Sequence, residues 1–416
     1  MQREGSLYSR EKYLSVLRPF YSDRELIKVV TGVRRCGKSS LLELVRKEIQ
    51  SHGVAEANIL NINLDQRPYI GVRSPEALER VIDKGFEKAE GLKYLFIDEI
   101  QNVNGFEILI NAYRESGEYS IFITGSNSYL LSGELVTKLT GRYLEIEMTT
   151  LTFDEYIGMK RFLNLHVDED LSRELRSYIV EGGFPYALNF ERLEDKRFYV
   201  HSVINEIFDK DVKSNPKIRK KHLFDLIMQF VINNFGCTIS IDNIVNHLKD
   251  VLHENVRKET VYRYLEQLEN LKIVSKCTRF DLKSKRSLKG GEKYYLSDLS
   301  FYFLRNTDNR ISYGPVLENI VYQYAKSLGY KVSIGRIGNF EVDFILRNPS
   351  LSYSYVQVAM YILTDSPQTE EREYRSLERI RDNYPKYLLT LDALQQERGG
   401  IIHANLAEFI ANENRF

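Results

Sequence analysis

The sequence has no tryptophan, few cysteines and no excess charge of either sign. Its three cysteines, Cys36, Cys237 and Cys277, lie far apart and form no Cys-x-x-Cys motif. This pattern predicts neither a disulfide framework nor a zinc site, and it favours a reducing compartment. Because 58 basic and 58 acidic side chains cancel, total charge gives no argument for a nucleic-acid partner, and any such argument must be local.

Long apolar runs are also missing. None approaches the roughly 20 residues that a membrane span needs, and the first residues are polar and lack the apolar core of a signal peptide. No long repeat, low-complexity segment or heptad array is present. The 416 residues are 43% hydrophobic and 28% charged. We therefore expect a globular cytoplasmic protein of several domains, without a membrane partner.

Short apolar runs alternate with amphipathic helical patterns in the first 150 residues, which predicts a mostly parallel sheet flanked by helices. The predicted strands are Leu26–Thr31, Ile59–Leu64, Tyr94–Ile97, Ser120–Thr124 and Tyr143–Met148. The pattern then becomes helical and is interrupted by a turn at Glu181–Pro185. We place domain boundaries at 1–150, 151–214, 215–306 and 307–416.

A glycine-rich segment follows the first strand. Residues 32–39 fit the pattern Gly-x-x-x-x-Gly-Lys-Ser/Thr without a mismatch, and an amphipathic helix, Ser39–Gln50, begins directly after the lysine. In such a loop, backbone N–H groups and the helix dipole bind phosphate oxygens. We expect Lys38 to contact the β- and γ-phosphates and Ser39 to bind Mg²⁺. The predicted nucleotide-binding residues are Gly32, Arg34, Arg35, Cys36, Gly37, Lys38, Ser39 and Ser40.

Two carboxylates end the strand Tyr94–Ile97. Asp98 is predicted to bind the magnesium ion, and Glu99 to polarise the water that attacks the γ-phosphate. In isolation, the Asp-Glu pair would fit a helix N-cap equally well.

Two further candidates come from later segments. The apolar strand 121–124 is followed by Gly125-Ser126-Asn127, so Ser126 or Asn127 would reach the γ-phosphate or the attacking water, although the same residues also suit a simple turn. Arg142 is a candidate for stabilising charge in phosphoryl transfer, from the same or a neighbouring subunit; a solvated or ion-paired side chain is the alternative.

These segments resemble a prokaryotic AAA-type family. The similarity rests on Val-Val-Thr-Gly-Val-Arg-Arg-Cys-Gly-Lys-Ser-Ser, Phe-Ile-Asp-Glu-Ile-Gln, Ile-Thr-Gly-Ser-Asn-Ser and Gly-Arg-Tyr, and on the later Gly-Gly-Phe-Pro and Glu-Val-Asp-Phe. The resemblance implies a P-loop NTPase core, a helical lid and a C-terminal DUF4143-like region. It also implies that Lys38 and Ser39 bind nucleotide, that Asp98 and Glu99 serve metal and water, and that Asn127 is a sensor. AAA-type relatives often assemble into rings, so a homo-oligomer is a possible state.

Residues 215–306 resemble a winged-helix module. Three helices are predicted at His222–Asn234, Ser240–Leu248 and Lys258–Glu269, followed by two strands. On the third helix Val261, Tyr264, Leu265 and Leu268 form the apolar face, and the residues predicted to face outward are Lys258, Thr260, Arg263 and Gln267.

A basic stretch follows the third helix. Residues 276–293 include seven basic and two acidic residues, and we expect a hairpin with its tip at Gly290-Gly291. The predicted DNA contacts are Lys258, Arg263, Lys283, Lys285 and Arg286, mainly to the backbone; a protein partner is the alternative.

The last domain resembles the PD-(D/E)xK nuclease-like fold. Glu318 lies on the predicted helix Pro315–Leu328, and Asp343 on a strand, where this fold binds Mg²⁺. The next strand should carry Glu-x-Lys, but Gln357 and Ala359 stand there. Lys386 is a substitute that the spacing does not require. We therefore expect a degenerate site at Glu318, Asp343 and Gln357, retained for binding or assembly.

The sequence thus predicts an α/β ATPase with a P-loop NTPase parallel sheet, followed by a helical and winged-helix domain and an α/β nuclease-like domain. ATP and Mg²⁺ are the expected ligands. Nucleotide state would change how the C-terminal modules meet DNA or protein. An ATP-gated nuclease and a slowly hydrolysing regulatory switch are the alternatives.

Overall fold

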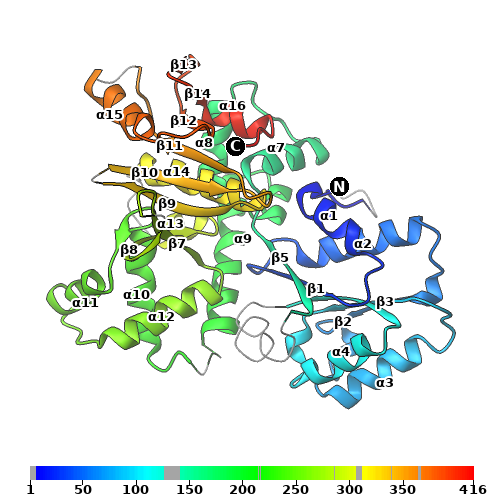
Figure 1. Cartoon of the computed structure of the whole chain (residues 1–416). Helices are drawn as coiled ribbons and strands as arrows, with labels where there is room; N and C mark the ends of the chain where they lie inside the picture. Colours follow the sequence, from blue (N-terminus) through cyan, green and yellow to red (C-terminus); the bar gives the residue numbers. More distant parts are fainter. Residues whose placement is uncertain are drawn as a thin grey trace. The chain divides into compact units, whose positions relative to one another are not determined.

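The computed structural model describes residues 6–125, 141–213, 215, 217–284, 286–305, 312–338, 340–363 and 367–416 (Figure 1). Two compact units divide the chain, with the boundary between Thr149 and Thr150. Among the described helices, none combines the length and the apolar character that a membrane span requires.

The N-terminal unit is a five-stranded parallel sheet with helices, as predicted. Its strand order is β2-β3-β4-β1-β5, so β4 lies between β1 and β3. The strands are β1 (Ile27–Gly32), β2 (Ile59–Asn63), β3 (Lys93–Asp98), β4 (Tyr119–Thr124) and β5 (Tyr143–Met148). The helices are α1 (Glu11–Leu17), α2 (Lys38–Ser51), α3 (Pro75–Gly85) and α4 (Phe106–Glu115). All five predicted strands are found within two residues of their expected ends.

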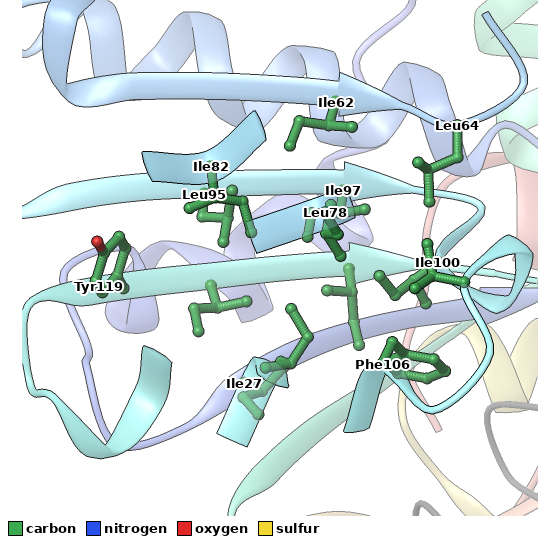
Figure 2. Packing of buried hydrophobic residues seen from close by; sticks show 14 of the residues in the cluster. Ile27, Ile62, Leu64, Leu78, Ile82, Leu95, Ile97, Ile100, Phe106 and Tyr119 are labelled. Carbon is green, nitrogen blue, oxygen red and sulfur yellow. The ribbon is translucent and has the colours of Figure 1, made fainter. Parts of the chain in front are cut away.

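Apolar side chains cover one face of this sheet. Figure 2 shows Ile62, Leu95 and Ile97 from the strands meeting Leu78 and Ile82 from α3. These side chains are fully buried, so each contributes about 1.5–3 kcal/mol to folding. Helix α3 begins where Ser74 caps it through its hydroxyl, which accepts from the Ala77 N–H at 3.3 Å, with proline as the first helical residue. The core holds the strand ends that carry the polar residues of the site.

Helices open the C-terminal unit. They are α7 (Phe153–Phe162), α8 (Leu171–Glu181), α9 (Leu193–Glu206), α10 (Lys221–Asn233), α11 (Ile241–Asp250), α12 (Lys258–Asn270) and α13 (Ser300–Arg305). A capping box between Thr152 and Glu155 starts α7.

The predicted turn after α8 depends on close packing. The Gly183 N–H donates to Asp298 at 2.8 Å, and a Cβ on Gly183 would lie 2.4 Å from the Leu151 carbonyl oxygen. Only glycine fits there without displacement.

Nine strands of the C-terminal unit form one mixed sheet, in the order β13-β14-β12-β11-β10-β9-β7-β8-β6. They are β6 (Thr238–Ile239), β7 (Val274–Asp281), β8 (Arg286–Leu296), β9 (Lys331–Ile337), β10 (Phe340–Arg347), β11 (Tyr353–Val358), β12 (Lys386–Thr390), β13 (Gln396–Arg398) and β14 (Ile401–Asn405). The helices that accompany the later strands are α14 (Tyr313–Ser327), α15 (Pro367–Glu378) and α16 (Leu406–Ala411). Because β7 pairs in parallel with β9, the hairpin that follows α12 and the nuclease-like strands share this sheet.

Two predictions about the middle segment are wrong. Gly290 and Gly291 do not form the hairpin tip, since β7 ends at Asp281, β8 begins at Arg286, and the glycines lie inside β8, at an irregularity in the pairing. Gln267 does not face outward: it is buried and accepts a hydrogen bond from Asn215 at 3.1 Å. The apolar face that was predicted for α12 is buried.

Candidate nucleotide site

The glycine-rich loop connects β1 to α2 at the carboxyl edge of the N-terminal sheet. Gly32 has φ +145°, and a Cβ there would lie 2.3 Å from the Met148 carbonyl oxygen, so that only glycine fits. Gly37 has φ +109° and precedes the first helical residue, Lys38. The Lys38 ammonium donates to the carbonyl oxygens of Gly32 at 3.0 Å and Val33 at 3.2 Å. The Lys38 side chain thus folds back over the loop, and its contact with phosphates stays a prediction.

The remaining loop residues differ in exposure. Ser39, Ser40 and Arg35 are exposed, Arg34 is half-buried, and Cys36 is buried. Helix α2 begins beside the Ser39 hydroxyl, where a helix N-terminus favours anions.

Asp98 and Glu99 lie at the same edge of the sheet as this loop. Asp98 is the last residue of β3 and Thr124 is the last residue of β4. Thr124 pairs with Val30 of β1, so the carboxyl ends of β3, β4 and β1 lie at the same edge of the sheet. Because neighbouring strands are about 4.8 Å apart, Asp98 lies roughly 10 Å across the sheet from β1. The Ser39 hydroxyl and the Asp98 carboxylate supply oxygen ligands at this edge, and these fit a magnesium ion bound together with a polyphosphate.

Two polar neighbours orient the buried Asp98 carboxylate. The Thr124 hydroxyl donates to one oxygen, and the Asn63 amide donates to the other at 2.9 Å. Thr124 also accepts the Glu99 backbone N–H at 3.2 Å. Sequence reasoning selected Ser126 or Asn127 after this strand and missed Thr124 and Asn63. The signal was present, because both are polar residues at carboxyl ends of strands.

Glu99 has a left-handed backbone, with φ +59° and ψ +45°. Its carboxylate accepts a hydrogen bond from Gln101. A non-glycine residue costs about 1–3 kcal/mol in this conformation, and such residues cluster at functional sites.

Arg10 contacts the phosphate loop from outside. Its guanidinium donates to the Cys36 carbonyl oxygen at 3.0 Å and to the Thr149 carbonyl oxygen at 2.8 Å. Since the peptide is planar and trans, fixing the Cys36 carbonyl points the Gly37 N–H away from Arg10. No local pattern predicts this contact, because 26 residues separate the partners.

Arg142 lies at the opposite edge of the sheet. It precedes β5, whose six residues run about 20 Å from the amino edge to the carboxyl edge. Its guanidinium donates to Glu115 at 2.6 Å. This corrects the prediction for a single chain: Arg142 is an exposed, ion-paired residue far from the loop. A role in a neighbouring subunit stays a prediction. Asn127 lies outside the described residues.

The predicted DNA-contact residues are separated. Lys258 is exposed and pairs with Asp242, whereas Arg263 is partly buried, 5.3 Å from the Tyr264 ring. Lys283 and Arg286 are exposed beside the β7–β8 turn. Lys285 lies outside the described residues.

The nuclease-like residues come together, with an unexpected partner. Lys293 of β8 lies 3.0 Å from Glu318, 3.2 Å from Glu341 and 4.0 Å from Asp343. Both ends of the Gln357 side-chain amide are hydrogen-bonded. Its oxygen accepts from the Asp343 N–H at 3.3 Å, and its NH₂ donates to Glu373 at 2.9 Å.

Lys386, the expected substitute lysine, is engaged elsewhere. Its ammonium donates to the Asp382 carbonyl oxygen at 2.9 Å, away from the cluster around Asp343. Sequence analysis counted Lys293 only as one of several basic residues.

Comparison with known proteins extends these observations. Residues 24–157 match the AAA domain family, and residues 172–308 match a domain of unknown function, DUF8612. The expected DUF4143-like region is thus not confirmed. A Walker-type ATPase of Pyrococcus abyssi has a similar structure, with a TM-score of 0.50 and 16% identity over 73% of this chain and 97% of that one. At this identity, the likeness shows the fold.

Two relatives span most of the chain. An uncharacterized protein of Methanocaldococcus jannaschii is 29% identical over 367 residues, which are 86% of this chain and 79% of that protein. An uncharacterized protein of Haemophilus influenzae is 34% identical over 388 residues, which are 92% of this chain and 94% of that protein. The chain therefore belongs to the family of the Haemophilus influenzae protein, and its N-terminal unit is an AAA domain with the P-loop NTPase fold.

Proposed function

We propose that the protein binds Mg-ATP at the carboxyl edge of the N-terminal sheet and hydrolyses it. One observation carries the proposal: the loop of Lys38 and the pair Asp98/Glu99 end strands that are separated only by β4. A phosphate-binding loop and an acidic pair at one edge are the parts that phosphoryl transfer requires.

Each residue has a role in the proposal. Loop N–H groups and Lys38 hold the phosphates, while Ser39 and Asp98 hold the magnesium ion, which neutralises phosphate charge. Thr124 and Asn63 orient Asp98 through the hydrogen bonds described above.

Glu99 polarises the attacking water. Its strained backbone and the hydrogen bond from its N–H to Thr124 support this role, since both hold it at the strand end. Asn127 remains the proposed sensor of the γ-phosphate.

Phosphate release from Mg-ATP tests this function. Glu99→Gln should bind ATP with unchanged affinity and hydrolyse it at least about 100-fold more slowly, the range that a general base contributes. Glu118→Gln is the matched control, because this exposed glutamate pairs with Lys93 before β4 begins and should leave turnover unchanged.

Lys38→Ala should remove the thermal stabilisation that ATP confers. If Glu99→Gln turns over as fast as the unmodified protein, Glu99 is not the base. Binding without measurable turnover would favour the alternative of a regulatory switch.

We further propose that the C-terminal unit binds the backbone of duplex DNA. The supporting observation is a group of basic side chains around the β7–β8 turn. Arg286 and Arg336 pair in register with Asp281 from either side, and Lys283 follows in the turn. Arg375 of α15 and Arg379, which follows that helix, lie over the ring of Phe340, at 5.5 and 3.8 Å.

Within the described residues, the basic side chains of this group are not held in close ion pairs. No ion pair joins Lys283, Arg286, Arg336, Arg375 or Arg379 to a carboxylate within 4 Å among the described residues, and Glu341 nearby is engaged by Lys293. Cationic side chains that are not held in close ion pairs can contact phosphates.

A mobility shift over a range of salt concentrations tests the DNA proposal. Arg375→Ala with Arg379→Ala should weaken binding and lower the slope of log K against log salt by up to about 2. Arg398→Ala is the control, because three glutamates of α15 already balance Arg398. An unchanged slope in the double variant would favour a protein partner.

A further inference from the structure

Lys293 lies inside the carboxylate cluster of the nuclease-like region. The cluster consists of Glu318 on α14 and of Glu341 and Asp343 on β10, whereas the lysine comes from β8. Its side chain is 7% exposed, with the ammonium 3.0–4.0 Å from all three carboxylates. A lysine therefore occupies the space between the acidic groups to which the fold resemblance assigned a magnesium ion.

The cluster surrounds the Lys293 ammonium with carboxylates. The Glu318 carboxylate accepts a hydrogen bond from the Lys293 ammonium at 3.0 Å, and the Glu341 carboxylate lies 3.2 Å from it. A buried ammonium among several carboxylates is strongly held, because removing it would leave uncompensated buried charge.

Other groups of the protein also form hydrogen bonds with Glu318, Asp343 and Gln357. Tyr295 donates its hydroxyl to Glu318 at 2.7 Å, and the Val358 N–H donates to Asp343 at 2.8 Å. Gln357 is held between the Asp343 N–H and Glu373. These contacts fix the side chains of Glu318, Asp343 and Gln357 in their present orientation around the lysine.

A divalent metal does not fit this arrangement. Magnesium requires oxygen ligands at about 2.0–2.1 Å in octahedral geometry. Within the described parts of the chain, no three acidic, histidine or cysteine side chains are arranged to hold a metal ion. The resemblance predicts a metal ion at Glu318 and Asp343, whereas the structure has the Lys293 ammonium beside both carboxylates.

We propose that Lys293 is the resident cation of this cluster and takes the electrostatic place of a divalent metal. Its ammonium holds β8 against α14 and β10, and the carboxylates become able to bind a divalent cation only when the lysine is removed. This inference concerns the C-terminal unit and is independent of the proposed ATP hydrolysis.

Mn²⁺ binding to the full chain without nucleotide tests the inference, measured by calorimetry and by thermal unfolding. The unmodified protein and Asp343→Asn should respond to Mn²⁺ alike, since neither binds it in the cluster. Lys293→Met should melt at a lower temperature without metal, and should bind Mn²⁺ at least tenfold more tightly than the unmodified protein. Adding Asp343→Asn to Lys293→Met should abolish that gain.

Lys276→Met provides the matched control. Lys276 lies on the neighbouring strand β7 and pairs with Glu292 at 3.4 Å, outside the cluster. This variant should gain no Mn²⁺ affinity, whereas a gain equal to that of Lys293→Met would overturn the inference.

Three further results would contradict it. The first is Mn²⁺ binding by the unmodified protein that Asp343→Asn abolishes. The second is plasmid cleavage by the unmodified protein with Mg²⁺ that Asp343→Asn abolishes. The third is a folded Lys293→Met variant without any gain in Mn²⁺ affinity. If Lys293→Met is recovered only unfolded, the unmodified protein decides, because equal Mn²⁺ responses with and without Asp343→Asn support the inference.

Discussion

Arg10→Met should loosen the phosphate loop from outside. The substitution removes the donor of a hydrogen bond to the Tyr13 hydroxyl at 3.4 Å and of two shorter ones, to the carbonyl oxygens of Cys36 and Thr149, at 3.0 and 2.8 Å. A hydrogen bond from a charged donor contributes about 1.5–3 kcal/mol, and only one of the two is fully buried, so we expect a loss of about 2–4 kcal/mol. If the N-terminal unit, Met1–Thr149, unfolds by itself, that lowers its melting temperature by roughly 5–15 °C. The affinity for ATP should fall as well, because the Gly37 N–H is no longer held in one direction.

Urea unfolding and ATP titration measure both effects. Arg18→Met is the control, because Arg18 is 41% exposed and pairs with Glu11 and Glu48 at the surface, an arrangement that contributes about 0–1 kcal/mol. If Arg10→Met unfolds at the same urea concentration as Arg18→Met and binds ATP normally, the contact to Cys36 does not hold the loop.

Two further predictions concern the C-terminal unit. Burial raises the pKa of Glu269 from 4.5 to about 7, so its ionisation in the folded state costs stability as pH rises from about 4.5 to 7, by up to about 3 kcal/mol. Glu269→Gln should therefore raise the melting temperature at pH 8 but hardly at pH 4.5; an equal gain at both would refute this. Gly183→Ala should cost about 1–3 kcal/mol in urea unfolding, because its Cβ would meet the Leu151 carbonyl oxygen at 2.4 Å. Gly314→Ala, with open space, should be neutral, and equal effects of both would exclude the clash.

Local patterns predicted much of the nucleotide site. The loop motif needs consecutive residues, and the carboxylates of Asp98 and Glu99 directly follow a strand, so short segments carry both signals. Parallel pairing then brings strand ends to one edge without further information from the sequence. The same reasoning would have selected Asn63 and Thr124 had the residues at each strand end been compared.

Contacts between distant segments could not be predicted in this way. Arg10 reaches Cys36 across 26 residues, and Lys293 reaches Glu318 across 25. Neither lysine nor arginine has a pattern that distinguishes a buried ion pair from a solvated side chain. Residue type and the Gly-Arg-Tyr segment suggested Arg142, but the direction of β5 places it away from the site of its own chain.

Helical periodicity also has a limit at α12. The pattern identified one buried face, but a second segment packs against the helix, where Asn215 contacts Gln267. A polar residue becomes buried when a neighbour supplies its hydrogen bond, and a single-helix pattern does not contain the neighbour.

The parallel pairing of β7 with β9 has a consequence for truncated forms of the protein. Ending the chain at residue 306 would remove β9 and leave Arg279, Phe280 and Asp281 with an open strand edge. It would also remove Phe344 and Tyr322, whose rings pack on Tyr295. Exposed edges and uncovered aromatic rings promote self-association, so the isolated segment 215–306 should aggregate rather than report how this part of the protein binds its partners.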